Sequence, residues 1–162
     1  MTSKLKNLDE LMTIADEARG NGKIVVFTNG CFDLLHRGHV HILRQAKAAG
    51  DLLIVAVNSD RSVKAIKGPS RPVYSETDRL ELVAAMEMVD YAILFDEPDP
   101  CKLIAAIKPD VLAKGADWDA AEVVGADIVK RAGGRVILVP YLKGYSTTEL
   151  IERIQNYNGE SM

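Results

Sequence analysis

Residues 23–39 read KIVVFTNGCFDLLHRGH, and this stretch decides the fold. Its first five residues are mostly apolar and β-branched, which predicts a buried strand over 23–27. A glycine-containing turn follows, and a helix is expected to begin near Gly38 and to end at Ala49, just before Gly50. A buried strand that leads through a turn into a helix is the repeating unit of parallel α/β sheets.

The rest of the chain repeats this alternation. Further strands are predicted at 52–57, 91–95, 111–113 and 136–139, and helices at 8–20, 60–66, 75–88, 99–107, 122–132 and 146–154. The pattern predicts an α/β fold, a single-domain Rossmann-like open parallel sheet of about five strands with helices on both faces. One domain is expected over 1–162, with 1–22 as the N-terminal helix and lead-in and 156–162 as a polar tail that frays.

Helix ends carry recognisable signals. Asp60, Ser75 and Ser146 are expected to cap the helices that follow them. Pro100 is expected to take the first position of its helix, where a missing N–H is tolerated. Ligands of such folds bind at the carboxyl ends of the strands, so the segments after each strand are where functional residues are expected.

The composition is that of a globular protein and excludes several classes of partner. Hydrophobic residues make up 48% and charged residues 27% of the 162 residues, and the formal net charge of −3 gives no basic surface for nucleic acid. Two cysteines are too few for a disulfide scaffold. The N-terminus MTSKLKNLDE lacks the apolar run of a signal peptide, and the longest apolar stretch, 52–57, is too short to span a membrane. We therefore expect a cytoplasmic protein with no membrane or nucleic-acid partner.

All three histidines of the chain lie within six positions, as His36, His39 and His41. His36 and His39 are one helical turn apart at a helix start, where free N–H groups and the helix dipole suit a phosphate. Two imidazoles there can donate hydrogen bonds to a phosphoryl group. Two alternatives stay open: one histidine caps the helix while another fills the surface, or the cluster binds zinc together with Cys31 and Asp33. His41 falls on a different helix face and is expected to be structural.

Several common motifs are absent from the sequence. There is no G-x-x-x-x-G-K-[ST] phosphate loop and no G-x-G-x-x-G after the first strand, which disfavours a P-loop nucleotidase and a dehydrogenase. There is also no G-x-S-x-G elbow of a hydrolase.

Two other motifs together resemble a known family. Residues 29–39, NGCFDLLHRGH, resemble the G-x-F-D-x-x-H-x-G-H signature of the nucleotidyltransferase superfamily typified by glycerol-3-phosphate cytidylyltransferase, and residues 143–148, KGYSTT, resemble its second signature. Segments 27–33, 55–60, 67–73 and 114–118 resemble the branch that adenylylates D-glycero-β-D-manno-heptose 1-phosphate. The resemblance covers about 8–154. With no kinase sequence attached, it implies the free-standing form of this branch rather than half of a bifunctional heptose kinase.

The resemblance implies an adenylyltransferase that transfers AMP from ATP to heptose 1-phosphate, giving ADP-heptose and pyrophosphate by direct in-line attack. In this family ADP-heptose supplies the lipopolysaccharide core. ATP is then a co-substrate, Mg²⁺ is carried by its triphosphate with no protein metal site, and a homodimer is the family expectation. Two alternatives stay open: a CTP-dependent cytidylyltransferase for glycerol 3-phosphate or a similar alcohol phosphate, and a nucleotide-binding module that has lost catalysis.

The motifs also imply residue roles. By resemblance, His36 and His39 hold the triphosphate and stabilise the transferring group, and Lys67, with Lys64 as the alternative, binds the attacking phosphate. The residues expected to bind ATP are Asn29, Gly30, Cys31, Phe32, Lys114, Gly115, Asp117, Ser146, Thr147 and Thr148. The residues expected to bind the sugar phosphate are Asp33, Lys64, Arg71 and Arg79, the last with a surface ion pair as its alternative role.

Two positions depart from the family pattern. Many relatives carry threonine where this chain has Cys31, so a hydroxyl contact is lost while the backbone contact is kept. The helix start is expected to lower the pKa of the Cys31 thiol, but covalent cysteine catalysis is not favoured. The cytidylyltransferase form of the second motif begins with an arginine, whereas residues 141–143 here read YLK. That arginine contact is lost, and whether Lys143 replaces it stays open.

Overall fold

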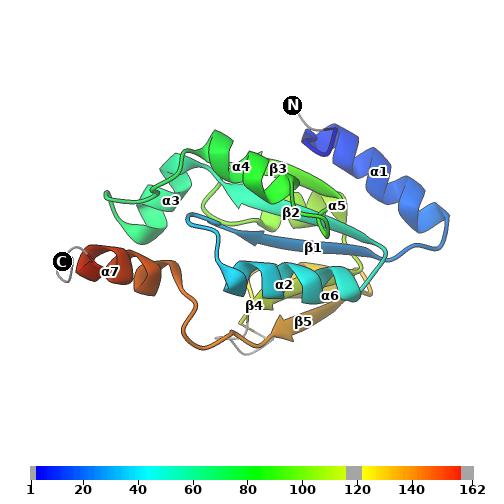
Figure 1. Cartoon of the computed structure of the whole chain (residues 1–162). Coiled ribbons are helices and arrows are strands. Elements are labelled where there is room, and N and C mark those ends of the chain that lie inside the picture. Colours follow the sequence, from blue (N-terminus) through cyan, green and yellow to red (C-terminus); the bar gives the residue numbers. More distant parts are fainter. Residues whose placement is uncertain (1–2, 116–121, 158–162) are drawn as a thin grey trace.

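The computed structural model describes residues 3–115 and 122–157 (Figure 1). These residues build a five-stranded, wholly parallel sheet with the strand order β3-β2-β1-β4-β5. The strands are β1 (Val25–Gly30), β2 (Leu52–Asn58), β3 (Tyr91–Phe95), β4 (Val111–Gly115) and β5 (Arg135–Val139). The predicted α/β class, the parallel pairing and the number of strands are thereby confirmed.

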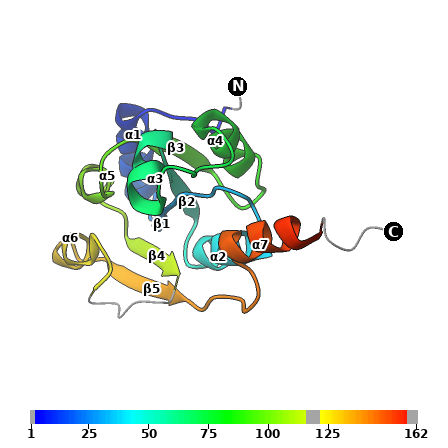
Figure 2. The same ribbon diagram turned by 90° about the vertical axis from the view of Figure 1, so that its left-hand side faces the viewer.

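Helices cover both faces of this sheet, as the alternation predicts. The helices α1 (Leu8–Gly20), α5 (Cys101–Ile107) and α6 (Ala126–Arg131) pack on one face, and α2 (Arg37–Ala48) and α4 (Glu76–Ala84) pack on the other. Two more, α3 (Asp60–Lys67) and α7 (Thr147–Tyr157), lie beyond the carboxyl ends of the strands (Figures 1 and 2). No described helix is long and apolar enough to cross a membrane.

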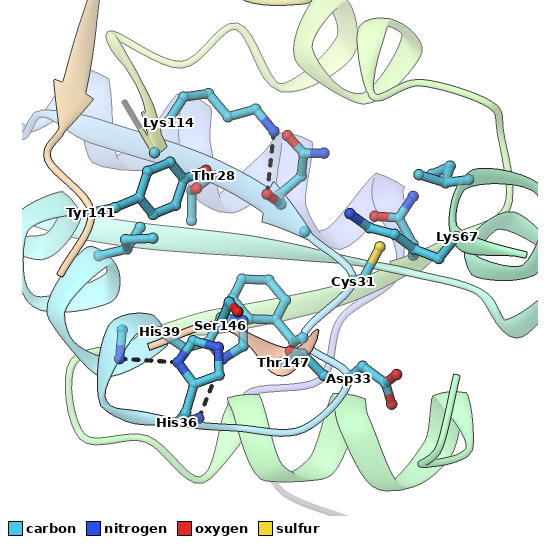
Figure 3. Close-up of a pocket in the computed structure, with 18 of the residues that line it drawn as sticks. Thr28, Cys31, Asp33, His36, His39, Lys67, Lys114, Tyr141, Ser146 and Thr147 are labelled. Carbon is cyan, nitrogen blue, oxygen red and sulfur yellow. Dashed lines mark hydrogen bonds between the residues drawn. The ribbon is translucent and has the colours of Figure 1, made fainter. Parts of the chain in front are cut away.

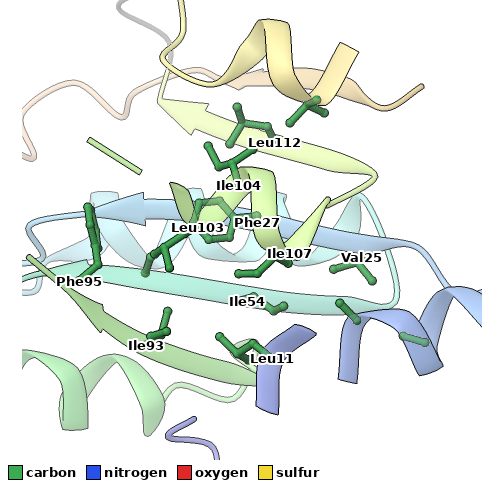
Figure 4. Packing of buried hydrophobic residues seen from close by; sticks show 14 of the residues in the cluster. Leu11, Val25, Phe27, Ile54, Ile93, Phe95, Leu103, Ile104, Ile107 and Leu112 are labelled. Carbon is green, nitrogen blue, oxygen red and sulfur yellow. The ribbon is translucent and has the colours of Figure 1, made fainter. Parts of the chain in front are cut away.

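Side chains alternate along each strand and divide the core into two layers. In β1, Val25 and Phe27 face α1 and α5 (Figure 4), whereas Val26 faces α2 and α4. Since both layers are covered by helices, the strands read as continuous apolar runs rather than as alternating ones. This is the physical reason that short apolar runs are sufficient to predict them.

Element boundaries differ from the sequence prediction by a few residues. Strand β1 begins at Val25, two residues later than expected, and it also ends later, because Thr28 to Gly30 still pair with β2. Helix α4 stops at Ala84, and α6 starts at Ala126. Ser59, rather than Asp60, caps α3, and Pro100 is the N-cap of α5 rather than its first residue. Of the polar tail, residues 156–157 continue α7, and residues 158–162 lie outside the described part of the chain.

The strand order places a crevice at the carboxyl ends of the central strands. From β1 the chain passes through α2 on one face of the sheet to reach β2, whereas from β4 it passes through α6 on the other face to reach β5. The two connections therefore leave the neighbouring strands β1 and β4 in opposite directions. Such a reversal opens a crevice above the strand ends, which is the usual ligand site of this architecture.

Candidate active site

A pocket of about 760 Å³ occupies this crevice (Figure 3). Its walls come from the turn after β1, the start of α2, the ends of α3 and β4, and the loop between β5 and α7. The predicted site residues that line it are Asn29, Gly30, Cys31, Phe32, Asp33, His36, His39, Lys67, Arg71, Lys114, Gly115, Ser146 and Thr147. The two sequence motifs, more than a hundred residues apart, thus meet in one cavity.

His36 and His39 form a reciprocal cap at the start of α2. The Nδ1 of His36 accepts the N–H of Gly38 at 3.1 Å, and the Nδ1 of His39 accepts the N–H of His36 at 3.3 Å. The two rings are stacked with their centroids 3.9 Å apart. Because each Nδ1 accepts, each neutral ring carries its proton on Nε2 and has a donor there. His36 thus caps the helix, as the first half of the capping alternative predicts, whereas His39 lines the pocket and does not fill the surface, and the reciprocal caps orient the pair for a second role.

Burial keeps both imidazoles neutral. It lowers the pKa of His36, and it lowers the pKa of His39 to about 4, with a further contribution from the neighbouring His36. Near pH 7 the pair therefore offers two N–H donors without a net charge. Donors fixed in this way suit phosphoryl oxygens on which charge grows during transfer.

Gly38 joins the two motifs because it has no side chain. A Cβ at this position would lie 2.8 Å from Cε1 of His36 and 3.1 Å from the carbonyl oxygen of Tyr145. The start of α2 and the loop before α7 can therefore approach each other only over a glycine. The Arg37 guanidinium, 5.6 Å from the centre of the Tyr145 ring, adds a second contact between the same two segments.

The turn after β1 has an unusual backbone at Phe32. This residue has a φ of +48°, in the left-handed region that non-glycine residues seldom adopt. Its buried ring packs on the Gly30 main chain and lies 5.4 Å, centre to centre, from the ring of His39. The same side chain thereby supports the turn and one of the two histidines.

The thiol of Cys31 lines the pocket but is not activated. Burial raises its pKa, an effect that outweighs the nearby positive charges of Lys67 and Arg79. The expectation that the helix start lowers this pKa is therefore wrong, because loss of water around the thiol dominates. A protonated, half-buried thiol is a poor nucleophile, so the structure does not favour covalent catalysis by Cys31.

Asp33 organises the segment that follows α3. Its Oδ2 accepts from Nε of Arg71 at 2.5 Å, and its Oδ1 accepts the N–H groups of Val73 and Tyr74 at 2.7 and 3.1 Å. Asp33 is buried, and both of its oxygens are engaged by the chain itself. It therefore positions Arg71 at the pocket wall, and its own contact with the sugar phosphate stays a prediction.

The environment of Arg79 differs from the one that the sequence predicts. The sequence suggests a phosphate contact or a surface ion pair, yet Arg79 has no exposed surface and is not among the residues that line the pocket. Its guanidinium donates to the carbonyl oxygens of Cys31 at 2.5 Å, Asn58 at 2.7 Å and Tyr74 at 3.1 Å, and it pairs with Asp60 at 2.8 Å. These partners use its donors internally, so Arg79 ties together the ends of β1, β2, α3 and the segment before α4.

The structure distinguishes the lysines. Lys67 lines the pocket, whereas Lys64 is exposed and lies outside it. Lys114, at the end of β4, donates through Nζ to the carbonyl oxygen of Asn29 at 3.3 Å, and burial lowers its pKa to about 8. The side-chain oxygen of Asn29 is buried without a partner in the described structure, so a polar ligand has an acceptor available there.

The second motif contributes the start of α7. Ser146 accepts the N–H of Glu149 at 3.1 Å and so caps this helix, as predicted. Ser146 and Thr147 line the pocket, Thr148 does not, and Asp117 lies outside the described residues. Lys143 is exposed and does not line the pocket either, so the structure gives no support for its replacing the missing arginine.

The sequence prediction omits several residues of the cavity wall, among them Tyr141, Val123 and Val124. Tyr141 has a sequence signal, because it stands at the start of the segment where the cytidylyltransferase form of the second motif has an arginine. The two valines carry no signal that separates them from core residues.

No metal centre is formed by the described side chains. Within residues 3–115 and 122–157, no three His, Cys, Asp or Glu residues are grouped so that they could hold a metal ion. The zinc alternative therefore gains no support. The donors that do converge are N–H groups and lysines, which fit phosphates, and a Mg²⁺ ion that arrives on a triphosphate needs no protein cage.

Comparison with known proteins agrees with this geometry. The chain matches the cytidylyltransferase-like family model over residues 27–153. The bifunctional protein HldE of Pelobacter propionicus is 49% identical over 152 residues, which are 94% of this chain and 31% of that protein. The HldE protein of Methylobacillus flagellatus is 51% identical over 151 residues, 93% of this chain and 31% of that protein. This chain thus spans about a third of the length of these curated relatives.

Solved structures extend the comparison. The lipopolysaccharide core biosynthesis protein from Thermoplasma volcanium superposes with a TM-score of 0.62 at 37% identity and covers 77% of this chain and 100% of its own. The pantoate-beta-alanine ligase from Francisella tularensis reaches the same TM-score of 0.62 at 15% identity over 97% of this chain and 78% of its own, and it shows the fold alone. The matched family model, the relatives and the paired motifs at one pocket agree, and this chain belongs to the cytidylyltransferase-like family.

Proposed function

We propose that this chain transfers AMP from ATP to D-glycero-β-D-manno-heptose 1-phosphate and releases pyrophosphate. The observation that carries the proposal is the stacked, neutral pair His36 and His39, whose Nε2 donors lie in the same pocket as the start of α7. The heptose branch is supported by the segments quoted above, by the HldE relatives and by the likeness to a lipopolysaccharide core biosynthesis protein.

The pocket supports a direct displacement. A phosphate oxygen of the sugar phosphate attacks the α-phosphorus of ATP, a new P–O bond forms, and the bond to the β-phosphate breaks to release pyrophosphate. This chemistry needs alignment and charge stabilisation more than proton transfer. His36 and His39 donate to the oxygens of the transferring group, and the backbone after β1 approaches the same phosphate. Mg²⁺, when bound with ATP, neutralises part of the triphosphate charge.

Cations and hydroxyls divide between the two substrates. Lys114 and the start of α7, with Ser146 and Thr147, hold the β- and γ-phosphates, since a helix N-terminus of this length offers free N–H groups. Lys67 binds the attacking phosphate, and Arg71, fixed by Asp33 through Nε, keeps its remaining donors for the sugar phosphate. We also place the protein in the cytoplasm, where ATP is supplied, and propose a homodimer, which analytical ultracentrifugation tests.

The test is pyrophosphate release from four substrate pairs, ATP or CTP with heptose 1-phosphate or glycerol 3-phosphate. We expect turnover with ATP and the heptose, and at least a hundredfold loss of kcat in His36→Ala and His39→Ala. His41→Ala is the matched control, because His41 lies on the same helix outside the pocket lining. Turnover only with CTP and glycerol 3-phosphate would move the protein to the cytidylyltransferases. ATP binding that His36→Ala leaves intact, with no turnover of any pair, would indicate a non-catalytic module.

A further inference from the structure

The pocket wall combines two kinds of chemistry. The histidines, Lys67, Lys114 and the start of α7 are suited to phosphates. Apolar side chains come from the loop after β5 and from the residues before α6, where Glu122 also lines the wall. There Tyr141 and Val124 leave 47% and 48% of their surface exposed while lining the cavity. Exposed apolar side chains that converge inside a pocket favour a flat apolar ligand group.

Tyr141 is held in place by the main chain of β4. A Cβ on Gly115 would lie 2.5 Å from both Cζ and Oη of Tyr141 and 2.7 Å from Cε1. The hydroxyl-bearing edge of the ring therefore occupies the space that any other residue at 115 would fill. Gly115 does not have a left-handed backbone, so this glycine is required for space and not for conformation.

This ring lies beside the phosphate-binding groups. Gly115 directly follows Lys114, and Tyr141 precedes the cap residue Ser146 by five positions in the same loop. Figure 3 shows the ring reaching into the pocket beside Lys114 and Thr28. Tyr141 therefore shares the pocket wall with Lys114 and Ser146, the groups assigned above to the phosphates of the nucleotide.

We propose that Tyr141, seated against Gly115, is the residue that selects adenine over cytosine. The inference rests on the proposed function and deepens it. An uncharged aromatic ring binds a base through stacking, which grows with the ring area and so favours a purine over a pyrimidine. The cytidylyltransferase form of this motif begins instead with an arginine, whose donors can serve the oxygen and ring nitrogen acceptors of cytosine. Replacing a charged donor by an aromatic ring changes which base is favoured.

The experiment measures the affinity of three probes by calorimetry: ATP, CTP and inorganic tripolyphosphate. We expect the wild type to prefer ATP to CTP. Tyr141→Ala should weaken ATP about tenfold or more, the usual worth of one stacked base, while CTP changes less and tripolyphosphate stays within twofold. Tyr141→Phe should keep the preference, because the ring remains. Tyr157→Ala, at a tyrosine outside the pocket with 79% of its surface exposed, is the control and should match the wild type.

Gly115→Ala gives an independent test, because its methyl group would collide with the Tyr141 ring. The new methyl group displaces the Tyr141 ring, so this variant should lose ATP preference as Tyr141→Ala does. When Gly115→Ala is combined with Tyr141→Ala, the ring is already absent. The methyl group should then lower the ATP affinity less than twofold further. Thermal denaturation of each variant checks that the fold is kept.

Three outcomes would overturn the proposal: an unchanged ratio of ATP to CTP affinity in Tyr141→Ala, a parallel loss of tripolyphosphate binding, or additive losses in the double variant. Because binding is measured without an acceptor, the proposed function is tested separately. A wild type that binds ATP but does not turn over heptose 1-phosphate contradicts the proposed function. The role of Tyr141 is then still tested by the ratio of ATP to CTP affinity. A wild type that binds tripolyphosphate but neither nucleotide contradicts both.

Discussion

At the scale of single residues, the histidine pair owes its chemistry to the backbone around it. Main-chain N–H groups occupy the Nδ1 atoms of His36 and His39, which fixes the tautomer and turns both Nε2 atoms into donors. Burial then removes the charge that a free histidine would carry in mild acid. A neutral donor is available over a wider pH range than a charged one, and this leads to two predictions about titration.

The first prediction concerns stability in acid. Burial holds the pKa of His39 at about 4, below the ordinary 6.5, so between these values the unfolded chain binds a proton that the folded chain does not. The contribution of His39 to the free energy of unfolding is fully present above pH 6.5. It decreases as the pH drops towards 4, and the total loss is roughly 3 kcal/mol. Urea denaturation across this range checks it, with His39→Asn as the comparison because asparagine can replace the Nδ1 acceptor. Equal pH slopes in the two proteins would contradict the prediction.

The second prediction concerns Lys114 in alkali. Its ammonium is present below a pKa of about 8 and is lost above it, because burial favours the neutral amine. The kcat/KM for ATP, which reports the free enzyme, should therefore decline as the pH rises through 8. Lys114→Met should show a lower value without this decline. Lys64→Met, at an exposed lysine outside the pocket, should keep the wild-type profile, and a decline that survives in Lys114→Met would rule out this assignment.

At the scale of elements, the junction of α2 with the loop before α7 depends on Gly38. We expect Gly38→Ala to lower kcat/KM at least tenfold, because its Cβ would sit 2.8 Å from the His36 ring and must push the ring or the Tyr145 segment away. Stability should fall by only about 1–2 kcal/mol, since the contact is local. Gly20→Ala is the matched control, as nothing lies within 4 Å of a Cβ there. Steady-state kinetics with denaturation of both variants separates the two effects, and equal activities would refute the steric argument.

Arg79 connects several elements at the carboxyl ends of the strands. Replacing it with methionine leaves the carbonyl groups of Cys31 and Asn58 without their donor in a buried setting, which should cost about 3 kcal/mol or more. Arg61→Met is the control, because Arg61 is exposed and its ion pair with Asp96 lies at the surface, where such pairs add little to stability. Chemical denaturation measures both costs. Similar losses in the free energy of unfolding for the two variants would show that Arg79 does not hold these elements together.

The helices and strands show which features of the fold can be predicted from local sequence. Apolar runs predicted all five strands, and the capping residues Ser75 and Ser146 predicted the starts of α4 and α7, since both signals are local. The role of Arg79 could not be predicted, because burial depends on how α4 docks against β1 and β2 and nothing local records it. The same holds for the ends of β1 and β4, where pairing with neighbours extends strands through residues that have no strand preference of their own, such as Gly30 and Gly115.

At the scale of the whole molecule, the pocket is assembled from segments spread along the chain, from the end of β1 to the start of α7. The motif residues could be predicted because they are contiguous in sequence, while the apolar part of the wall could not, since only folding brings Tyr141 to the same pocket as Val123 and Val124. The last contributor, α7, is also the least anchored. None of the 11 residues of this helix, all within the described part of the chain, is buried. Its attachment at the pocket runs through Tyr145, which contacts Arg37 and Gly38.

A weakly anchored helix that supplies phosphate-binding groups should be held by its ligand. Undocking of α7 removes Ser146 and Thr147 from the pocket, so a ligand that needs them stabilises the docked state by up to RT ln(1 + [L]/Kd), about 2.7 kcal/mol at a hundredfold excess over Kd. Amide hydrogen exchange of residues 146–157 should therefore slow by about tenfold or more when tripolyphosphate saturates the protein. The peptide covering α1, on the far side of the sheet from α2, should exchange unchanged (Figure 2). Slowing that is equal in both peptides would indicate global stabilisation, and no slowing in α7 would mean that its hydroxyls do not hold the phosphates.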